Sequence, residues 1–324
     1  MIDGSDRDID ALVSSLEFLQ HGEQLVLDLI AQGPKAIAPL RRFLLDGGPS
    51  VTYQPRQRAV EALAGLHAKE VLMEYLRQPR HIPNPVTRLA EEAVEITAAR
   101  ALNAWPTPEV VALLLELAGA HLQPGILDTL GEFRVREAIP YFIFGLEDDV
   151  CRSAAEGALR KLGAPAQEAL LDAVLSAKPS KEEESPSSLR RRRSAMRLLA
   201  EMKPAAPEAW PRLSRTLEES DPDLLVSAAQ MATGAGSPAE RGQAVRSLLA
   251  AWPSADWRLQ EQIGGCLIEL CPDAAPLIDA EIRSQASRGI EAEPANHFLG
   301  FLRRIKRQAQ AASGNLDKTD SPYE

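Results

Sequence analysis

Cysteine and aromatic residues are scarce in this sequence. Aromatic residues make up 5% of the 324 positions, and the three cysteines are Cys151, Cys266 and Cys271. Three is an odd number, and a spacing of five residues turns Cys266 and Cys271 about 140° apart around a helix. Neither a disulfide framework nor a zinc site fits this pattern. We expect free thiols in a reducing cytoplasm.

Long apolar runs and an excess of basic charge are also missing. The longest apolar candidate, residues 110–120, is interrupted by Glu116, and a membrane span needs roughly 20 apolar residues. The first eight residues are acidic and lack the apolar core of a secretory signal. The net charge is −10, whereas nucleic-acid binding draws its affinity from Lys and Arg. We therefore expect a cytoplasmic protein that binds neither a membrane nor a nucleic acid.

The sequence is rich instead in Ala, Leu, Glu and Arg, with 28 Arg against 8 Lys. These are strong helix formers, while the β-branched and aromatic residues that fill strands are scarce. The composition predicts an all-α fold with almost no strand.

One repeated unit is clearest over residues 134–163. Its first helix is expected over 136–146, and an Asp148-Asp149 turn follows, with Asp149 capping the second helix. We expect Arg152 to reach an acidic turn of an adjacent repeat. The second helix should bury one apolar face and end at Gly163. The residues expected on that face are Val150, Ala154, Ala155, Ala158, Leu159 and Leu162, while Arg152, Glu156, Arg160 and Lys161 occupy the other.

Second helices of this kind are predicted to end at nine places, with a loose period of about 35 residues. These places are Gln32, Leu66, Ala104, Gly131, Leu162, Met202, Gly234, Leu270 and Ala311. Helix pairs with this period indicate an α-solenoid of stacked antiparallel pairs, with roughly eight to nine repeats.

The unit at 134–163 resembles a HEAT repeat of the short PBS-lyase-like subtype. The matching residues are Ala138-Ile139-Pro140, Asp148-Asp149, Val150, Arg152, Ala154-Ala155, Ala158-Leu159 and Leu162-Gly163. The resemblance implies an armadillo-like superhelix that binds proteins. The units at 34–66 and 164–203 match this pattern in part, and those at 206–311 keep its rhythm with few motif residues.

The expected organisation is a single solenoid over residues 1–312, with capping helices over 5–32. An insertion at 47–55 separates the helices of an early repeat. A second insertion at 178–188 is expected to be flexible, and residues 313–324 form a polar tail expected to be disordered.

No catalytic, cofactor-binding or metal-binding residues are predicted. The five histidines lie singly, and the sequence has no phosphate loop and no nucleophile elbow. The deoxyhypusine hydroxylases, a family of helical-repeat enzymes, hold two irons with adjacent His-Glu pairs, and no histidine here is followed by Glu. Arg152 beside Cys151 would favour a thiolate, but a small packed residue at a helix start is the simpler interpretation. We expect no enzymatic activity.

Candidate partner-binding residues are the charged positions of the second helices and two aromatic residues. These two aromatic residues lie outside the apolar face that the first helix at 136–146 buries in the core. The candidates are Arg88, Glu92, Glu95, Arg152, Glu156, Arg160, Arg190, Arg193, Arg197, Tyr141 and Phe144. Arginine and aromatic residues are frequent at binding hot spots. Two interpretations of residues 190–193 stay open, an anionic docking patch or a solvated helix face.

These features favour a non-enzymatic scaffold or adaptor that binds a protein or peptide on the concave surface of the solenoid, and we expect a monomer without cofactors. Mixed charge suits a protein partner better than a phosphate backbone. The alternative is a PBS-lyase-like subunit that assists modification of a partner protein.

Overall fold

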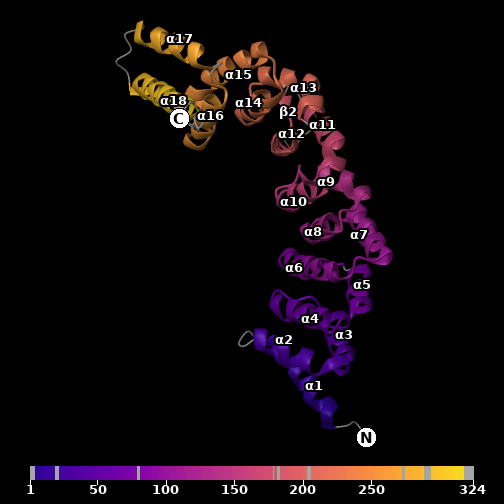
Figure 1. Ribbon diagram of the computed structural model, residues 1–324. Coiled ribbons are helices and arrows are strands. Elements are labelled where there is room, and N and C mark those ends of the chain that lie inside the picture. Colours follow the sequence, from indigo (N-terminus) through magenta and orange to yellow (C-terminus); the bar gives the residue numbers. More distant parts are fainter. Residues whose placement is uncertain are drawn as a thin grey trace, which may run out of the picture. The chain divides into compact units, whose positions relative to one another are not determined.

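The computed structural model describes residues 4–18, 22–78, 81–177, 179–180, 183–202, 206–271, 274–287 and 293–316. Eighteen α-helices occupy these residues and follow one another as nine pairs (Figure 1). The first helices are α1 (Gly4–Ser14), α3 (Ile37–Leu45), α5 (Lys69–Arg77), α7 (Pro108–Ala120), α9 (Ile139–Gly145), α11 (Gln167–Leu175), α13 (Ala206–Leu213), α15 (Pro238–Ala251) and α17 (Ala274–Ser287). The second helices are α2 (Gly22–Ala31), α4 (Gln54–Gly65), α6 (Pro85–Ala101), α8 (Pro124–Glu132), α10 (Arg152–Leu162), α12 (Pro186–Glu201), α14 (Pro222–Ala235), α16 (Trp257–Glu269) and α18 (Glu293–Leu316).

The prediction of an all-α fold built from helix pairs is confirmed. Eight of the nine second helices end within three residues of the predicted position, and α18 ends five residues later than predicted. The only strands in the described residues are β1 (Pro179–Ser180) and β2 (Glu183–Glu184), which form one short antiparallel ladder. None of the described helices has an apolar stretch long enough to cross a bilayer.

Four helices begin with the same local signal, a capping side chain followed by proline. The pairs are Asn84-Pro85, Ser185-Pro186, Asp221-Pro222 and Ser237-Pro238. The side-chain oxygen of each first residue accepts a hydrogen bond from a free backbone N–H of the first turn, and proline has no N–H that would need a partner there. These four starts are therefore encoded locally.

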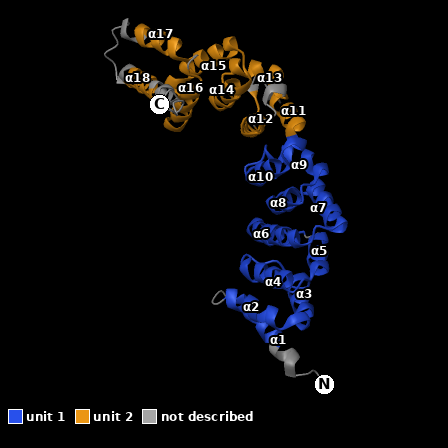
Figure 2. Cartoon of the chain, in the orientation of Figure 1, with its two compact units in different colours: residues 1–166 blue, residues 167–324 orange. Residues whose placement is uncertain are grey.

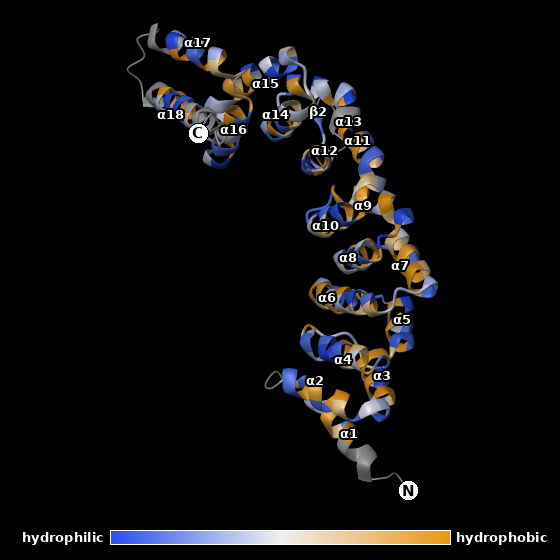
Figure 3. Cartoon of the chain, in the orientation of Figure 1, coloured by the Kyte–Doolittle hydropathy of each residue, from blue (hydrophilic) through white to orange (hydrophobic). Residues whose placement is uncertain are grey.

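The chain divides into two compact units, residues 1–166 and 167–324 (Figure 2). In the first unit α2, α4, α6, α8 and α10 pack side by side in chain order, and α1, α3, α5 and α7 form a second layer. Side chains of both layers are fully buried, among them Leu40, Leu63, Leu72 and Leu114. Burial of each such side chain stabilises the fold by about 1.5–3 kcal/mol. Figure 3 shows hydrophobic and hydrophilic residues on the same helices, as amphipathic layers require.

In the second unit α12, α14, α16 and α18 pack in chain order, α11 contacts α13, and α15 contacts α17. The 3₁₀ turn η8 (Trp252–Ser254) joins α15 to α16. It places Trp252 in a stack with Phe298 and Phe301 of α18, at centroid distances of 4.8 and 4.6 Å. This stack closes the core at the last described repeat.

Small residues set the distance between neighbouring helices at one point in the first unit. A Cβ at Gly131 of α8 would lie 2.6 Å from the Cβ of Ala158 on α10. Any side chain at Gly131 would therefore push the two helices apart.

Ion pairs connect successive repeats within both units. In the first unit they are Arg42–Asp10, Arg41–Glu74, Arg56–Glu91, Lys69–Glu109, Arg100–Asp128 and Lys161–Glu132. In the second they are Arg212–Glu168, Arg193–Asp221 and Arg258–Asp223. The prediction that Arg152 makes such a connection is wrong, because its guanidinium lies 2.9 Å from Asp149 in its own turn.

The turn before α10 also differs from the prediction in its cap. Asp148 rather than Asp149 accepts hydrogen bonds from the backbone N–H groups of Val150 and Cys151, both at 2.8 Å. Val150 is 70% exposed because it precedes the helix, which begins at Arg152. Glu156 is buried, although the helical pattern assigned it to the solvated face.

The insertion at 178–188 is shorter than predicted. Its described residues pair as β1 and β2, and α12 already begins at Pro186, with Ser185 as the capping residue. At the chain end, α18 continues to Leu316, so residues 313–316 are helical and not a disordered tail; residues 317–324 lie outside the described residues. The expected extent of a single solenoid and its capping helices at 5–32 stay predictions.

Candidate partner-binding site

Three of the predicted binding residues come together in the first unit. Arg88, Glu92 and Glu95 of α6 line one wall of a cleft of about 400 Å³. The other walls come from the end of α5, the segment before α6, the end of α7 and the start of α8. Their residues are Leu76, Arg77, Gln78, Ile82, Leu117, Ala120, His121, Gln123 and Ile126.

A buried ion pair fixes the wall of this cleft. Arg56 of α4 donates to both carboxylate oxygens of Glu91, at 3.0 and 2.9 Å, and their side chains are 5% and 2% exposed. The Tyr75 hydroxyl donates to the same carboxylate at 2.7 Å, and Arg56 also donates to the carbonyl of Gly47 at 2.9 Å. Buried charges need this degree of hydrogen bonding to be tolerated. The network thus joins α4, α5 and α6 with the 47–55 insertion.

The accessible charges of the cleft have both signs. The Arg88 side chain is 62% exposed and lies 3.9 Å from Glu92 on the next helical turn. Glu95 accepts a hydrogen bond of 2.8 Å from the Gln123 amide, which ties α6 to the segment before α8. Together with apolar Leu76, Leu117 and Ile126, these groups offer contacts to apolar, basic and acidic side chains alike.

A second predicted group lies on α10. Arg152 pairs with Asp149, and Arg160 lies 3.8 Å from Glu156, whose side chain is 12% exposed. None of these residues lines the cleft at α6. The structure therefore separates the α10 residues from the group at Arg88.

The third predicted group, on α12, is largely engaged inside its unit. Arg193 pairs with Asp221 and lies 3.5 Å from Asp223, and Arg197 lies 3.4 Å from Glu201. Arg190 is half-buried and also interacts with other residues of the chain.

Two of the four arginines at 190–193 are not accessible to a partner. Arg191 and Arg192 are buried, and Arg192 donates to the carbonyl of Val174 and to two carboxylates, Glu184 and Glu219. Burial alone would lower the pKa of Arg192, but these hydrogen bonds outweigh it and raise the pKa. The arginines hold the strand ladder and α11 against α12.

The two candidate aromatic residues of α9 differ in exposure. Phe144 is 58% exposed, whereas Tyr141 is half-buried beside Gly119 of α7. Phe142, between them, is fully buried in the core, as the helical pattern predicts.

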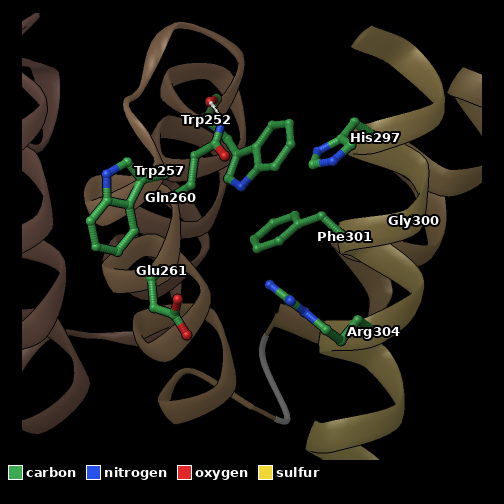
Figure 4. Close-up of a pocket in the computed structure, with 8 residues that line it drawn as sticks. All are labelled: Trp252, Trp257, Gln260, Glu261, His297, Gly300, Phe301 and Arg304. Carbon is green, nitrogen blue, oxygen red and sulfur yellow. Dashed lines mark hydrogen bonds between the residues drawn. The ribbon is translucent and has the colours of Figure 1, made fainter. Parts of the chain in front are cut away.

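The sequence reasoning missed a second cavity, in the other unit, between α16 and α18. Trp252, Trp257 and Phe301 line it (Figure 4). Two of the four tryptophans lie five positions apart there, which is a usable signal in a chain with so few aromatics. Their partners on α18 lie more than 40 positions away and could not be assigned from local pattern.

Two features of the described side chains concern reactivity, the protonation of the Cys151 thiol and the spacing of possible metal ligands. Burial, and secondarily Asp148, raises the pKa of Cys151 to about 12, so the neighbouring Arg152 does not produce a thiolate. Within the described residues, no three His, Cys, Asp or Glu side chains are grouped so that they could hold a metal ion.

Comparison with known proteins gives matches among solved structures. No family model and no curated protein sequence matches the chain. Among solved structures, human deoxyhypusine hydroxylase in complex with glycerol aligns at 16% identity over 82% of this chain and 96% of that chain, with a TM-score of 0.30.

The prediction of a protein without enzymatic activity is corrected by this comparison. It was drawn from the lack of catalytic motifs in the sequence, and the matched chain is by its name an enzyme. At this similarity no residue or activity carries over from one chain to the other. Within each unit, the stacking of helix pairs in chain order is the all-α solenoid architecture of HEAT-like repeats.

Proposed function

We propose that this chain binds a peptide segment of a partner protein in the cleft lined by Arg88, Glu92 and Glu95. The observation that carries the proposal is the convergence of these three side chains on one cavity. Beneath them, the buried Arg56–Glu91 pair holds the wall in place. A wall fixed in advance lowers the entropy cost of binding.

The charge distribution favours a peptide over a phosphate backbone. Glu92 and Glu95 would repel phosphates, while Arg77 and Arg88 supply positive charge on the same cleft. A peptide can place a basic side chain on the carboxylates, an acidic one on Arg88 and an apolar one against Leu117 and Ile126.

The alternative function, assistance in the modification of a partner protein, requires the same recognition step. Both functions depend on capture of a protein segment, so a binding experiment tests what they share.

A random peptide library displayed on phage tests the proposal. The library is selected on the wild-type chain, and bound clones are then compared on the double variant R88E/E92R, which keeps the net charge and the spacing of the two charges. We expect most selected peptides to lose at least about tenfold in affinity on this variant.

The matched control is the double variant R42D/D10R, which exchanges an exposed ion pair between α1 and α3. Selected peptides should bind this control as they bind the wild type. Equal binding to R88E/E92R and to the control would show that the cleft is not the binding site.

A further inference from the structure

The second unit contains a groove between α16 and α18 that differs in chemistry from the cleft at α6. It encloses about 400 Å³. Trp257 and Glu261 lie on the α16 side, and His297, Phe301 and Arg304 lie on the α18 side (Figure 4).

The aromatic floor of the groove is held rigidly. Trp252 and Phe301 are 4% and 6% exposed and are stacked on each other, and Phe298 stacks on Trp252 as well. The indole nitrogen of Trp252 is buried without a hydrogen-bond partner among the described residues. Trp257, by contrast, is 78% exposed, the largest value among the large apolar side chains described. Exposure of this large apolar side chain to water is unfavourable. Its burial against a partner would therefore stabilise the complex.

Glycines keep the groove narrow at its base and open above. A Cβ at Gly264 would lie 3.1 Å from Ile305 and 3.2 Å from Phe301, so α16 and α18 approach closely there. A Cβ at Gly300, which lines the groove, would have no atom within 4 Å. The space above Gly300 is therefore available to a side chain from outside.

The α18 side of the groove is basic. His297, Arg304 and Arg307 follow one face of the helix at spacings of seven and three residues. The Arg304 guanidinium lies over the Phe301 ring, 5.8 Å from its centroid, and neither Arg304 nor Arg307 makes an ion pair in the described part of the chain. Nearby charges are Glu261, which is exposed, and Arg258 and Lys306, which pair with Asp223 and Asp279.

We propose that this groove binds an acidic peptide segment of a partner protein, which inserts one apolar side chain above Gly300. The inserted side chain would be covered by Trp257 and would pack on Trp252 and Phe301. Carboxylates flanking it would pair with Arg304 and Arg307, because a guanidinium binds a carboxylate through two parallel hydrogen bonds. Tryptophan and arginine are the residues most enriched at the centres of protein interfaces.

This site goes beyond the proposed function. It lies in the other unit, and it selects an acidic peptide, whereas the cleft at α6 accepts charges of both signs. The loss of one site leaves the other intact, so the two proposals can fail separately.

The test uses fluorescein-labelled acidic nonapeptides that differ only in the central residue, which is alanine, leucine, phenylalanine or tryptophan. Binding to the full chain is measured by fluorescence anisotropy. We expect at least one large apolar centre to bind at least about tenfold more tightly than alanine. The variants W257A and R304E should each weaken that peptide by about tenfold or more.

Gly300→Leu is the sharpest variant, because it fills the groove from within. The added Cβ meets no atom within 4 Å, and leucine favours a helix more than glycine does, so the melting temperature should not fall. We expect this variant to lose binding of the peptide. The matched control is Gly157→Leu on α10, where an added Cβ also meets no atom within 4 Å, and it should bind like the wild type.

Four outcomes would overturn the proposal. They are equal binding of all four peptides, undiminished binding to Gly300→Leu, tighter binding of a single-stranded oligonucleotide than of any peptide, and a wild-type dimer that W257A converts to monomer. The third would assign the groove to nucleic acid, and the fourth would assign it to a second copy of this chain.

Discussion

Arg193 of α12 donates through Nε to both carboxylate oxygens of Asp221, at 3.0 and 3.2 Å. The same carboxylate accepts a hydrogen bond of 3.1 Å from the backbone N–H of Leu224 and so caps α14. The hydrogen bond to Asp221 raises the pKa of Arg193 despite its partial burial. One side chain thus begins a helix and connects it to the preceding repeat.

The two roles of Asp221 can be separated by substitution. Asp221→Asn keeps a good capping residue and removes the charge, whereas Asp221→Ala removes both. We expect the alanine variant to be about 1 kcal/mol less stable than the asparagine variant, the usual contribution of a cap. Urea unfolding of the two variants measures this difference directly, and equal midpoints would show that Asp221 does not act as a cap.

The buried Arg56–Glu91 pair should behave non-additively. Either Arg56→Met or Glu91→Leu leaves one buried charge without its partner, which costs about 3–5 kcal/mol. The double variant R56M/E91L buries no charge and should lose less than the two single losses combined. Equilibrium unfolding of all three variants tests this, and additive losses would contradict a coupled pair.

Asp148 should stabilise the start of α10, and Asp149 should not. Asp148→Ala removes the acceptor of two backbone N–H groups and should cost about 1 kcal/mol. Asp149→Ala removes an exposed ion pair with Arg152 and should cost no more than about 0.5 kcal/mol. A comparison of the two unfolding midpoints decides between them, and the reverse order would restore Asp149 as the capping residue.

The buried thiols should make the protein less stable in alkali. Burial raises the pKa of Cys151 and of Cys266 to about 12, whereas thiols in an unfolded chain ionise near pH 8.5–9. Below that range both states keep the protons, so these groups add no pH dependence. Above it only the unfolded chain releases them, and the free energy of unfolding falls by up to about 1.4 kcal/mol per thiol and pH unit.

The measurement for the thiols compares wild type with C151A/C266A at pH 8 and pH 10. Other groups titrate in this range too, so the relevant quantity is the difference between the two slopes. The wild type should lose more stability than the variant. Equal slopes would mean that the folded state ionises its thiols as readily as the unfolded chain.

The positions of the second helices could be predicted from the sequence because helix ends carry local signals. Gly163 ends α10 with a φ of 66°, a conformation that glycine adopts without strain, and Asn84-Pro85 marks the start of α6 by its cap. Such signals depend on neighbouring residues alone, which is why the second helices were located within a few residues.

Whether an individual charged side chain is buried or exposed could not be predicted in the same way. Arg191 and Glu156 have the sequence context of solvated helix positions, yet both are buried by neighbouring elements. Arg88, Glu92 and Glu95 were assigned to one surface because they lie on one helix, but the cleft that they line needs residues from α5, α7 and α8. The groove at Trp257 depends on α18, and no helical period relates residues so distant in the chain.

The inter-repeat ion pairs have a consequence for how such an array can grow. Helix α8 presents Asp128 to Arg100 on one side and Glu132 to Lys161 on the other, so it is acidic toward both neighbours. A tandem duplication of α7 and α8 would bring two acidic faces together, and like charges repel. The charges of α8 thereby match this repeat to its two neighbours, and a simple copy of it would stack less favourably than the present order does.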